Sequence, residues 1–374
     1  MSELTFRDST LPVEDRLASL LEALTTDEKL SLMAGRNFWE TREIPRLGIE
    51  RFRMTDGPRG VAWHSSGFKR NTAFPSGISL AASWDPELSR EFGEALGRET
   101  RAVGARMVLG PAFNICRTPL NGRTFEYFTE DPFLNRTLVP PIVQGVQSQG
   151  VAACIKHYVA NNQEFNRMRH SVEISERALR EIYLPAFEAG IREGDAWSVM
   201  SSYNRVNGVS MCENAELLNG RLRDEFGFRG FVVSDWTAAR QGKSGAAAMR
   251  AGFNLEMPGR GSIYRHKKLK EEFVQDLFNS EELDAALAPL LRVMLLTGHL
   301  DAPSAEDGER NTQRHWQLAR KMAAAGITLL KNDAGLLPLC KDDLNTLCVI
   351  GPRARTRNCW PLWGGSAGVW SPHE

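Results

Sequence analysis

The sequence predicts an α/β protein whose parallel strands form a barrel. Short apolar runs with β-branched residues alternate with amphipathic helical stretches, which is the pattern of βα units. Runs that are almost wholly apolar indicate strands covered on both faces, and six or more such units favour a barrel. Each run ends in a cluster of polar residues. Because a barrel carries its chemistry at the carboxyl ends of its strands, this placement favours an enzyme.

The elements follow in order along the chain. A helix is predicted over 13–24, and a second begins near Thr25, where Thr25 and Glu28 have the spacing of a capping box. Strands are predicted in the apolar runs at 51–54, 105–115, 151–155, 197–202, 231–233 and 253–257.

Amphipathic helices connect these strands. In the stretch 175–194, apolar residues recur at steps of three and four, at Leu179, Ile182, Tyr183 and Phe187. This face is expected to be buried against the sheet.

A domain boundary is predicted where the composition changes. Residues 1–300 hold the barrel units, and the polar segment 301–315 is interpreted as a linker. From 316 to 374, a helix, an apolar strand at 346–351 and a glycine-rich segment at 363–368 are typical of the opening of a second α/β domain. About sixty residues cannot bury the faces of such a domain, so it is expected to be incomplete.

Composition excludes several classes of protein. The 374 residues include 46 basic and 46 acidic residues, so the net charge gives no indication of nucleic-acid binding. The chain shows neither a signal-peptide pattern nor a run of about eighteen apolar residues, so no membrane association and a cytoplasmic location are expected. The six cysteines lie far apart, as is typical of reduced packing residues.

Asp235 follows the apolar run 231–233 and precedes Trp236. A carboxylate at a strand end beside an aromatic face suits a glycosidase nucleophile, which must be ionised, fixed by hydrogen bonds and close to an apolar platform for a sugar ring. The alternative is a helix N-cap, because the residues after Asp235 also suit the start of a helix.

Asp56 and two arginines are further candidates. Asp56 ends a strand, and the tight turn after it aims its side chain into the barrel mouth; the alternative is an Asx-turn. Arg117 and Arg123 lie among aromatic residues and suit the binding of hydroxyls or the orientation of a carboxylate. Surface ion pairs would also explain these two arginines.

Lys156 and His157 come directly after the run 151–155. Burying two chargeable groups at a strand end costs free energy unless they have partners. Tyr203 and Asn204 follow the next run and complete a polar ring. Such a ring suits a neutral polyhydroxylated ligand, which needs directional hydrogen bonds and one stacking face.

Metal and phosphate chemistry fit the sequence poorly. The seven histidines are dispersed, with no HxH or HExxH spacing. The glycine-rich segment 363–368 lacks the pattern of a phosphate-binding loop. No metal and no cofactor are therefore expected.

Six motifs carry a family resemblance: TDGPRG, NGRTFEYFTEDP, KHYVANNQEFNR, ERALREIYLPAFEAGI, SVMSSYNRVNG and FGFRGFVVSDW. Over residues 15–370 the chain resembles the β-glucosidase-like members of glycoside hydrolase family 3. The resemblance implies a (β/α)8-type TIM barrel or collapsed barrel, followed by the start of an α/β sandwich domain. It also implies retaining hydrolysis of terminal, non-reducing β-linked sugars without a metal or organic cofactor.

The resemblance implies a role for each candidate residue. Asp235 matches the catalytic nucleophile, and Trp236 matches the aromatic residue of the subsite. Asp56 matches the acid that binds sugar hydroxyls, and Tyr203 matches the tyrosine beside the nucleophile. The residues that match those gripping the glycone are Arg123, Lys156 and His157. The residues expected to lie around them are Arg117, Glu126 and Met200.

Two departures from the family pattern refine this interpretation. One bacterial subtype carries a histidine acid/base after the Lys-His pair, and the segment 156–174 here does not match it. In the β-glucosidase-like members the acid/base is a glutamate well inside the second domain, beyond Glu374, so none is assigned in this chain. Asp56 lies in a TDGP segment that xylosidase-like relatives replace, which favours a β-glucoside.

Several alternatives to a β-glucosidase stay open. The chain could be a catalytically deficient sugar-binding fragment that lacks its acid/base, or a β-xylosidase or other β-glycosidase of the same family. A metal hydrolase is disfavoured by the absence of histidines at ligand spacing, and a purely structural α/β protein is disfavoured by the six motifs. The expected partner is a β-glucoside or a short oligosaccharide, and assembly into a homo-oligomer is left open.

Overall fold

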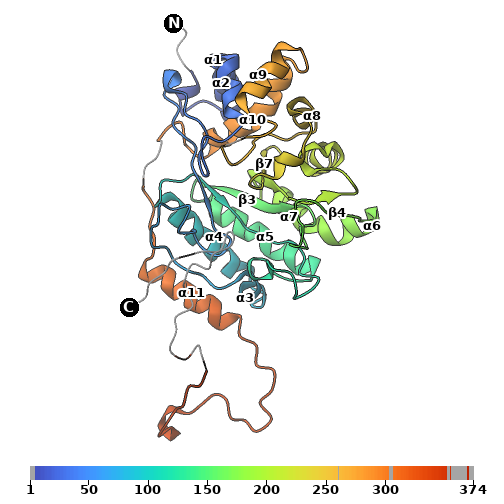
Figure 1. Cartoon of the computed structure of the whole chain (residues 1–374). Helices are drawn as coiled ribbons and strands as arrows, with labels where there is room; N and C mark the ends of the chain where they lie inside the picture. The colour runs from blue at the N-terminus through green and yellow to red at the C-terminus, as the bar shows by residue number, and fades with distance from the viewer. Residues whose placement is uncertain (1–4, 260, 303–305, 352–353, 355–368, 370–374) are drawn as a thin grey trace.

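The computed structural model describes residues 5–259, 261–302, 306–351, 354 and 369 (Figure 1). Five parallel strands form one sheet in the order β1-β2-β3-β5-β7. A second, two-stranded sheet pairs β4 with β6. The strands are β1 (Met54–Asp56), β2 (Met107–Leu109), β3 (Ala152–Tyr158), β4 (Ser171–Val172), β5 (Ser198–Ser201), β6 (Arg205–Val206) and β7 (Phe231–Ser234).

The main sheet is extended past both edges by irregular backbone. Beyond β7, Val233 bridges Leu255 in parallel orientation, and Glu256 bridges Ala34. The segment after Ala34 then returns beside β1, where the Met54 amide donates to the Trp39 carbonyl at 2.9 Å. The predicted run 253–257 thus occupies a strand position without a regular ladder. The prediction of a parallel barrel or collapsed barrel is confirmed.

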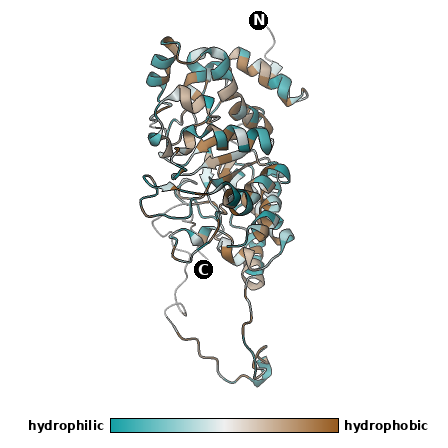
Figure 2. Ribbon diagram, turned by 90° about the vertical axis from the view of Figure 1, so that its right-hand side faces the viewer, coloured by the Kyte–Doolittle hydropathy of each residue, from teal (hydrophilic) through white to brown (hydrophobic). Residues whose placement is uncertain are grey.

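Helices cover the sheet, and in Figure 2 they are banded teal and brown, as expected for helices with one buried face. Two predictions near the N-terminus are confirmed: the first helix is α1, and the Thr25–Glu28 capping box starts α2. The helices are α1 (Val13–Ala23), α2 (Thr26–Leu32), α3 (Gly77–Ala81), α4 (Pro86–Arg101), α5 (Pro132–Gln147), α6 (Glu176–Ala178), α7 (Pro185–Arg192), α8 (Gly245–Arg250), α9 (His266–Val274), α10 (Ser280–Leu296) and α11 (Gln313–Ala325).

The predicted helix over 175–194 is interrupted. A π-helical segment, η4 (Leu179–Tyr183), lies between α6 and α7. Pro185 has no backbone N–H, and the Leu184 amide donates to the Leu179 carbonyl five residues back at 2.9 Å. This extra residue shifts the helical register, so Leu184 is buried while Ile182 is 39% exposed. The predicted burial of Ile182 is wrong.

The predicted strand over 105–115 is shorter than its apolar run. Strand β2 covers only Met107–Leu109, because Pro111 cannot donate a hydrogen bond to a neighbouring strand.

The segment predicted as a linker is docked on the barrel. Asp307 pairs with Arg101 of α4, and Arg310 donates to the Arg70 carbonyl at 2.9 Å. Helix α11 follows and ends before Gly326, so it is shorter than the predicted helix, which includes 327–330.

The chain after α11 runs away from the barrel in an extended path (Figure 1). Residues 327–351 are almost entirely exposed. The predicted strand at 346–351 does not form in this described segment, because an isolated strand without a hydrogen-bonding and packing partner is not stable in water. The glycine-rich segment 363–368 lies outside the described residues. The division into domains stays a prediction.

Candidate active site

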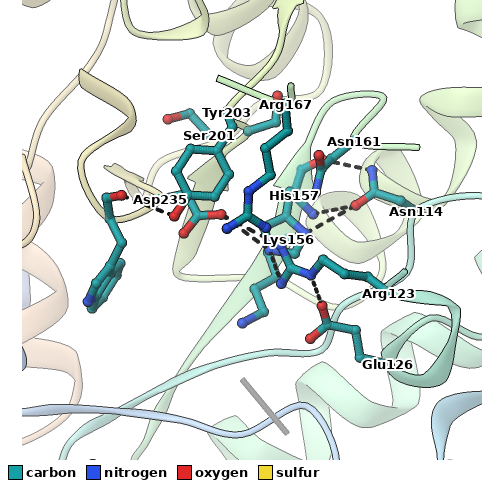
Figure 3. A network of polar contacts seen from close by, with 12 residues as sticks. Asn114, Arg123, Glu126, Lys156, His157, Asn161, Arg167, Ser201, Tyr203 and Asp235 are labelled. Atoms are coloured by element: carbon teal, nitrogen blue, oxygen red, sulfur yellow. Dashed lines mark hydrogen bonds and ion pairs between the residues drawn. The ribbon is translucent and has the colours of Figure 1, made fainter. Parts of the chain in front are cut away.

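The strand ends bring most of the predicted site residues together. Asp56 ends β1, and Lys156 and His157 lie in β3. Met200 of β5 is in register with Lys156, and Asp235 directly follows β7. Because the strands are parallel, these positions meet at one edge of the sheet. Figure 3 shows the side chains of Asp235, His157 and Arg123 pointing toward one another.

Asp235 is a buried carboxylate, 8% exposed. Its Oδ2 atom lies 3.6 Å from His157 Nε2 and 3.9 Å from Arg123 Nη1, and it has no hydrogen-bond partner among the described residues. Burial raises the pKa of Asp235 to about 6, and the positive charges of Arg123 and Lys156 oppose this only in part. The carboxylate is therefore ionised at neutral pH, and its buried Oδ2 atom is not committed to a hydrogen bond within the described residues.

The helix-cap alternative for Asp235 does not agree with the structure. The 3-10 helix after it, η7 (Ala238–Gln241), has Thr237 at its N-cap, and no side chain caps it. Trp236 and Thr237 both have left-handed backbone, with φ of 31° and 74°. Non-glycine residues rarely adopt this conformation, and such strain clusters at functional sites.

His157 is fully enclosed and neutral. Its Nε2 atom lies 2.9 Å from Arg123 Nη2, and its Nδ1 atom lies 3.3 Å from Asn114 Oδ1. A guanidinium can only donate, so Nε2 accepts and the proton is on Nδ1, facing Asn114. Burial, together with the positive charges of Arg123 and Lys156, lowers the pKa of His157 well below its ordinary value. The contact between His157 and Asp235 is therefore not an ion pair.

Arg123 is oriented by a buried acid. Its Nε atom pairs with Glu126 Oε1, and the Glu126 side chain is completely buried. This leaves the two terminal nitrogens of Arg123 directed at His157 and Asp235. The forked guanidinium thus connects three groups of the site.

Asp56 and Lys156 form a further ion pair of the site. Lys156 Nζ lies 3.0 Å from Asp56 Oδ1, and Lys156 is 2% exposed. Burial opposes ionisation of Asp56, but the charge of Lys156 and the contact with His64 outweigh it and lower the pKa of Asp56. The sequence predicts that a buried Lys156 needs a partner, and in the structure that partner is Asp56. The Asp56 carboxylate faces a cation rather than the backbone amide of an Asx-turn.

Aromatic residues flank Asp235. The Tyr203 hydroxyl donates to the Trp236 carbonyl at 3.0 Å, and burial, with the nearby charge of Asp235, raises the pKa of Tyr203. The Trp236 ring lies 5.3 Å from the ring of Trp39. These rings form an apolar face of the kind on which a ring-shaped ligand can stack.

Three residues of the site have no counterpart among the sequence-based candidates. Arg167 stacks on Tyr203 at 4.2 Å from its ring centroid, and its charge opposes the effect of burial on the pKa of Asp235. His64 Nε2 lies 3.9 Å from Asp56 Oδ2, and Trp39 contacts both His64 and Trp236. Arg167 is the last residue of the KHYVANNQEFNR motif, so the motif could have identified it as a candidate. Trp39 and His64 lie in loops without a periodic pattern.

Arg117 does not join this cluster. It is exposed, and its Nη1 atom donates to the Tyr183 hydroxyl at 3.2 Å. Arg117 lies at the start of the loop that contains Thr118 and Leu120, and this loop lies at the surface of the protein. The Asn204 side chain is buried, and its amide donates to the Val159 carbonyl at 3.1 Å, so it supports the backbone at this point. The prediction that Arg117 belongs to the site is therefore wrong: it is a surface residue, but among the described residues its partner is a tyrosine hydroxyl and not the acid of an ion pair.

Fold and site together define a class of protein: a β/α barrel with a polar, aromatic-lined binding site at the carboxyl ends of its strands. Residues 41–293 match the family model described as Glycosyl hydrolase family 3 N terminal domain. The chain belongs to glycosyl hydrolase family 3.

Relatives of this chain are named as glycosidases. It is 40% identical over 94% of its length to a β-glucosidase of Rhizobium radiobacter, and 38% identical over 89% to an exo-α-(1→6)-L-arabinopyranosidase of Bifidobacterium longum. A crystal structure of a Kluyveromyces marxianus β-glucosidase in complex with glucose matches 95% of the chain, with a TM-score of 0.85 and 35% identity. The chain covers only 42%, 45% and 43% of these proteins, respectively.

Two features are absent from the part of the chain that the structure describes. None of its helices is both long and apolar enough to cross a lipid bilayer. Among the same residues, no three His, Cys, Asp or Glu side chains are grouped so that they could hold a metal ion.

Proposed function

We propose that this chain forms the glycone-binding and nucleophilic part of a retaining β-glucosidase. The observation that carries the proposal is Asp235, a buried carboxylate whose Oδ2 atom has no hydrogen-bond partner among the described residues and faces Arg123 and His157. The names of the relatives support a glycosidase.

In the proposed mechanism Asp235 attacks the anomeric carbon. The bond to the aglycone breaks through an oxocarbenium-like transition state, and water then releases the sugar from the glycosyl ester. Arg123 holds Asp235 in place, and His157, whose Nε2 atom accepts from Arg123, fixes the guanidinium. Both side chains reach the ring hydroxyls, while the Asp56–Lys156 pair binds hydroxyls on the other side. Hydrogen bonds that strengthen as charge develops lower the activation free energy of this step.

No acid/base is assigned among these 374 residues, because the family resemblance attributes this role to a glutamate of the second domain. General acid catalysis contributes roughly a hundredfold to ten-thousandfold when the leaving group needs a proton. We therefore expect this chain to favour substrates with acidic leaving groups and to cleave cellobiose hardly at all.

The experiment that tests the proposal uses 2-deoxy-2-fluoro-β-glucosyl fluoride, whose leaving group needs no proton. Peptide mass spectrometry is expected to find the fluoroglucosyl group on Asp235. A folded chain that takes no label but still binds glucose would instead support a catalytically deficient sugar-binding fragment.

The identity of the sugar needs a separate comparison. The TDGP segment at Asp56 favours a glucoside, whereas one relative is named an arabinopyranosidase. Among dinitrophenyl glycosides of β-glucose, β-xylose and α-L-arabinopyranose, the glucoside is expected to react fastest. A preference for either pentose would replace the glucosidase proposal with another glycosidase of this family.

The labelling rate is expected to increase with pH, with a midpoint near 6. Asp235 must be ionised to attack, and burial raises its pKa to about 6. The rate of inactivation should therefore rise about tenfold from pH 5 to pH 8. His157 stays neutral over this range and adds no second inflection. A rate that is flat between pH 5 and pH 8 would contradict a raised pKa for Asp235.

A further inference from the structure

Glu99 is a buried carboxylate outside the Asp235 cluster. It lies on α4 and is 0% exposed. Its oxygens accept hydrogen bonds from the Thr72 amide at 2.9 Å and the Thr72 hydroxyl at 2.5 Å. They also accept from the Asn311 amide at 2.8 Å, and His315 Nδ1 of α11 lies 2.9 Å away. A buried carboxylate costs free energy unless it is hydrogen-bonded, so these contacts hold α4, the loop at Thr72 and the start of α11 together.

The loop at Thr72 belongs to the segment 57–74, which follows β1. Its outgoing limb contains Gly60, Val61, Ala62 and His64, and its returning limb contains Asn71, Thr72 and Phe74. The Phe74 amide donates to the Arg59 carbonyl at 3.0 Å, and the Asn71 side chain donates to the Val61 carbonyl at 3.0 Å. Gly60 has φ of 127°, and a Cβ atom there would lie 2.3 Å from the Thr72 carbonyl oxygen. The two limbs are therefore in direct contact, and the position of Thr72 determines that of the outgoing limb.

The outgoing limb in turn holds Asp56. The Ala62 amide donates to the Asp56 carbonyl at 2.8 Å, and the Asp56 amide donates to the Ser65 hydroxyl at 3.0 Å. His64, on the same limb, lies 3.9 Å from the Asp56 carboxylate. A continuous set of contacts therefore leads from Glu99 through the loop to the acid that we assign to hydroxyl binding.

We propose that Glu99 is a positioning residue that couples the docking of α11 to the position of Asp56. This inference rests on the proposed function, because it assigns glycone binding to Asp56. The segment before α11 is attached to α4 at a second point, through Asp307 and Arg101. Loss of the Glu99 carboxylate should loosen the loop and weaken sugar binding, while the attack by Asp235 on bound sugar is unaffected.

The test compares Glu99→Gln with Glu94→Gln in the full chain. Glu94 lies on the same helix, is partly exposed and pairs with Arg98 at 3.1 Å, so it is a matched control for the same chemical change. Glu99→Gln is expected to raise the half-saturating concentration of the fluoroglucosyl fluoride about tenfold, with the maximal labelling rate unchanged. Glu94→Gln should change neither value. Equal half-saturating concentrations in all three proteins would overturn the proposal.

Two further measurements make the test independent of folding defects and of the proposed function. If Glu99→Gln does not fold, Thr72→Val removes one of the same hydrogen bonds and should weaken sugar binding, whereas Thr72→Ser should restore it.

If the native chain takes no label, the proposed function fails, and hydrogen exchange then tests whether Glu99 is coupled to the segment that holds Asp56. Amides of residues 57–74 should then exchange faster in Glu99→Gln than in Glu94→Gln, and identical exchange would refute the coupling.

Discussion

Asp235→Asn is expected to reduce covalent labelling by the fluoroglucosyl fluoride at least about a thousandfold. An amide of the same shape is not a nucleophile, so the glycosyl ester cannot form. The measurement is the rate of mass increase of the intact chain, with peptide mapping of any residual label. Asp195→Asn, at an exposed aspartate, is the matched control and should label like the native chain. Labelling of Asp235→Asn at the native rate would remove Asp235 from the mechanism.

The same substitution should stabilise the folded chain at high pH. The pKa of Asp235 is ordinarily 3.8, and burial raises it to about 6, which corresponds to about 3 kcal/mol. The folded state binds this proton more tightly, so its stability falls as pH rises from about 4 to about 6, and the loss is complete above that range. Asp235→Asn removes that loss. Its gain in unfolding free energy should be largest near pH 8 and vanish near pH 4.

The parallel-strand pattern predicts the part of the site that the strands themselves carry. Asp56, Lys156, His157 and Asp235 all lie at or just after strand ends, and a parallel sheet brings such ends to one edge. This argument needs only the order of apolar runs and polar clusters along the chain. It does not give the pairing of Asp56 with Lys156, which depends on the register and curl of the sheet.

Residues on loops could not be placed in this way. Arg117 and Arg123 lie in one loop region with similar surroundings, yet Arg123 is anchored by buried Glu126 while Arg117 is on the surface. Arg167 and His64 reach the site through loops whose paths are set by tertiary contacts rather than by any periodic pattern. Sequence spacing therefore identifies candidates but not the direction of their side chains.

Lys156→Met is expected to destabilise the chain by about 3–5 kcal/mol at pH 7, because it removes one partner of a buried ion pair. Lys156 is 2% exposed, and its Nζ atom lies 3.0 Å from Asp56 Oδ1. Methionine fills a similar volume, so the loss of stability measures the effect of leaving the Asp56 carboxylate without its neighbouring positive charge. The measurement is urea-induced unfolding of the native chain and the variant, followed by circular dichroism.

The pH dependence of this loss follows from the pKa of Asp56. In the native chain Lys156 holds this pKa below its ordinary value of 3.8, so the pair contributes stability above that value and loses it as pH falls through the lowered pKa. Without Lys156, burial raises the pKa of Asp56, and protonation relieves the penalty in acid. The difference between Lys156→Met and the native chain should therefore begin to shrink as pH falls through the raised pKa of Asp56 in the variant, above 3.8, and continue to shrink down to the lowered pKa of the native chain.

A double variant separates this electrostatic effect from a packing defect. Asp56→Asn combined with Lys156→Met removes the isolated carboxylate, so it should be more stable at pH 7 than Lys156→Met alone. If the double variant is less stable than Lys156→Met by the full cost of Asp56→Asn alone, the two side chains do not interact and the pair has no role in stability. Because both groups are assigned to hydroxyl binding, either result leaves the double variant with weakened affinity for glucose, so stability and binding are measured separately.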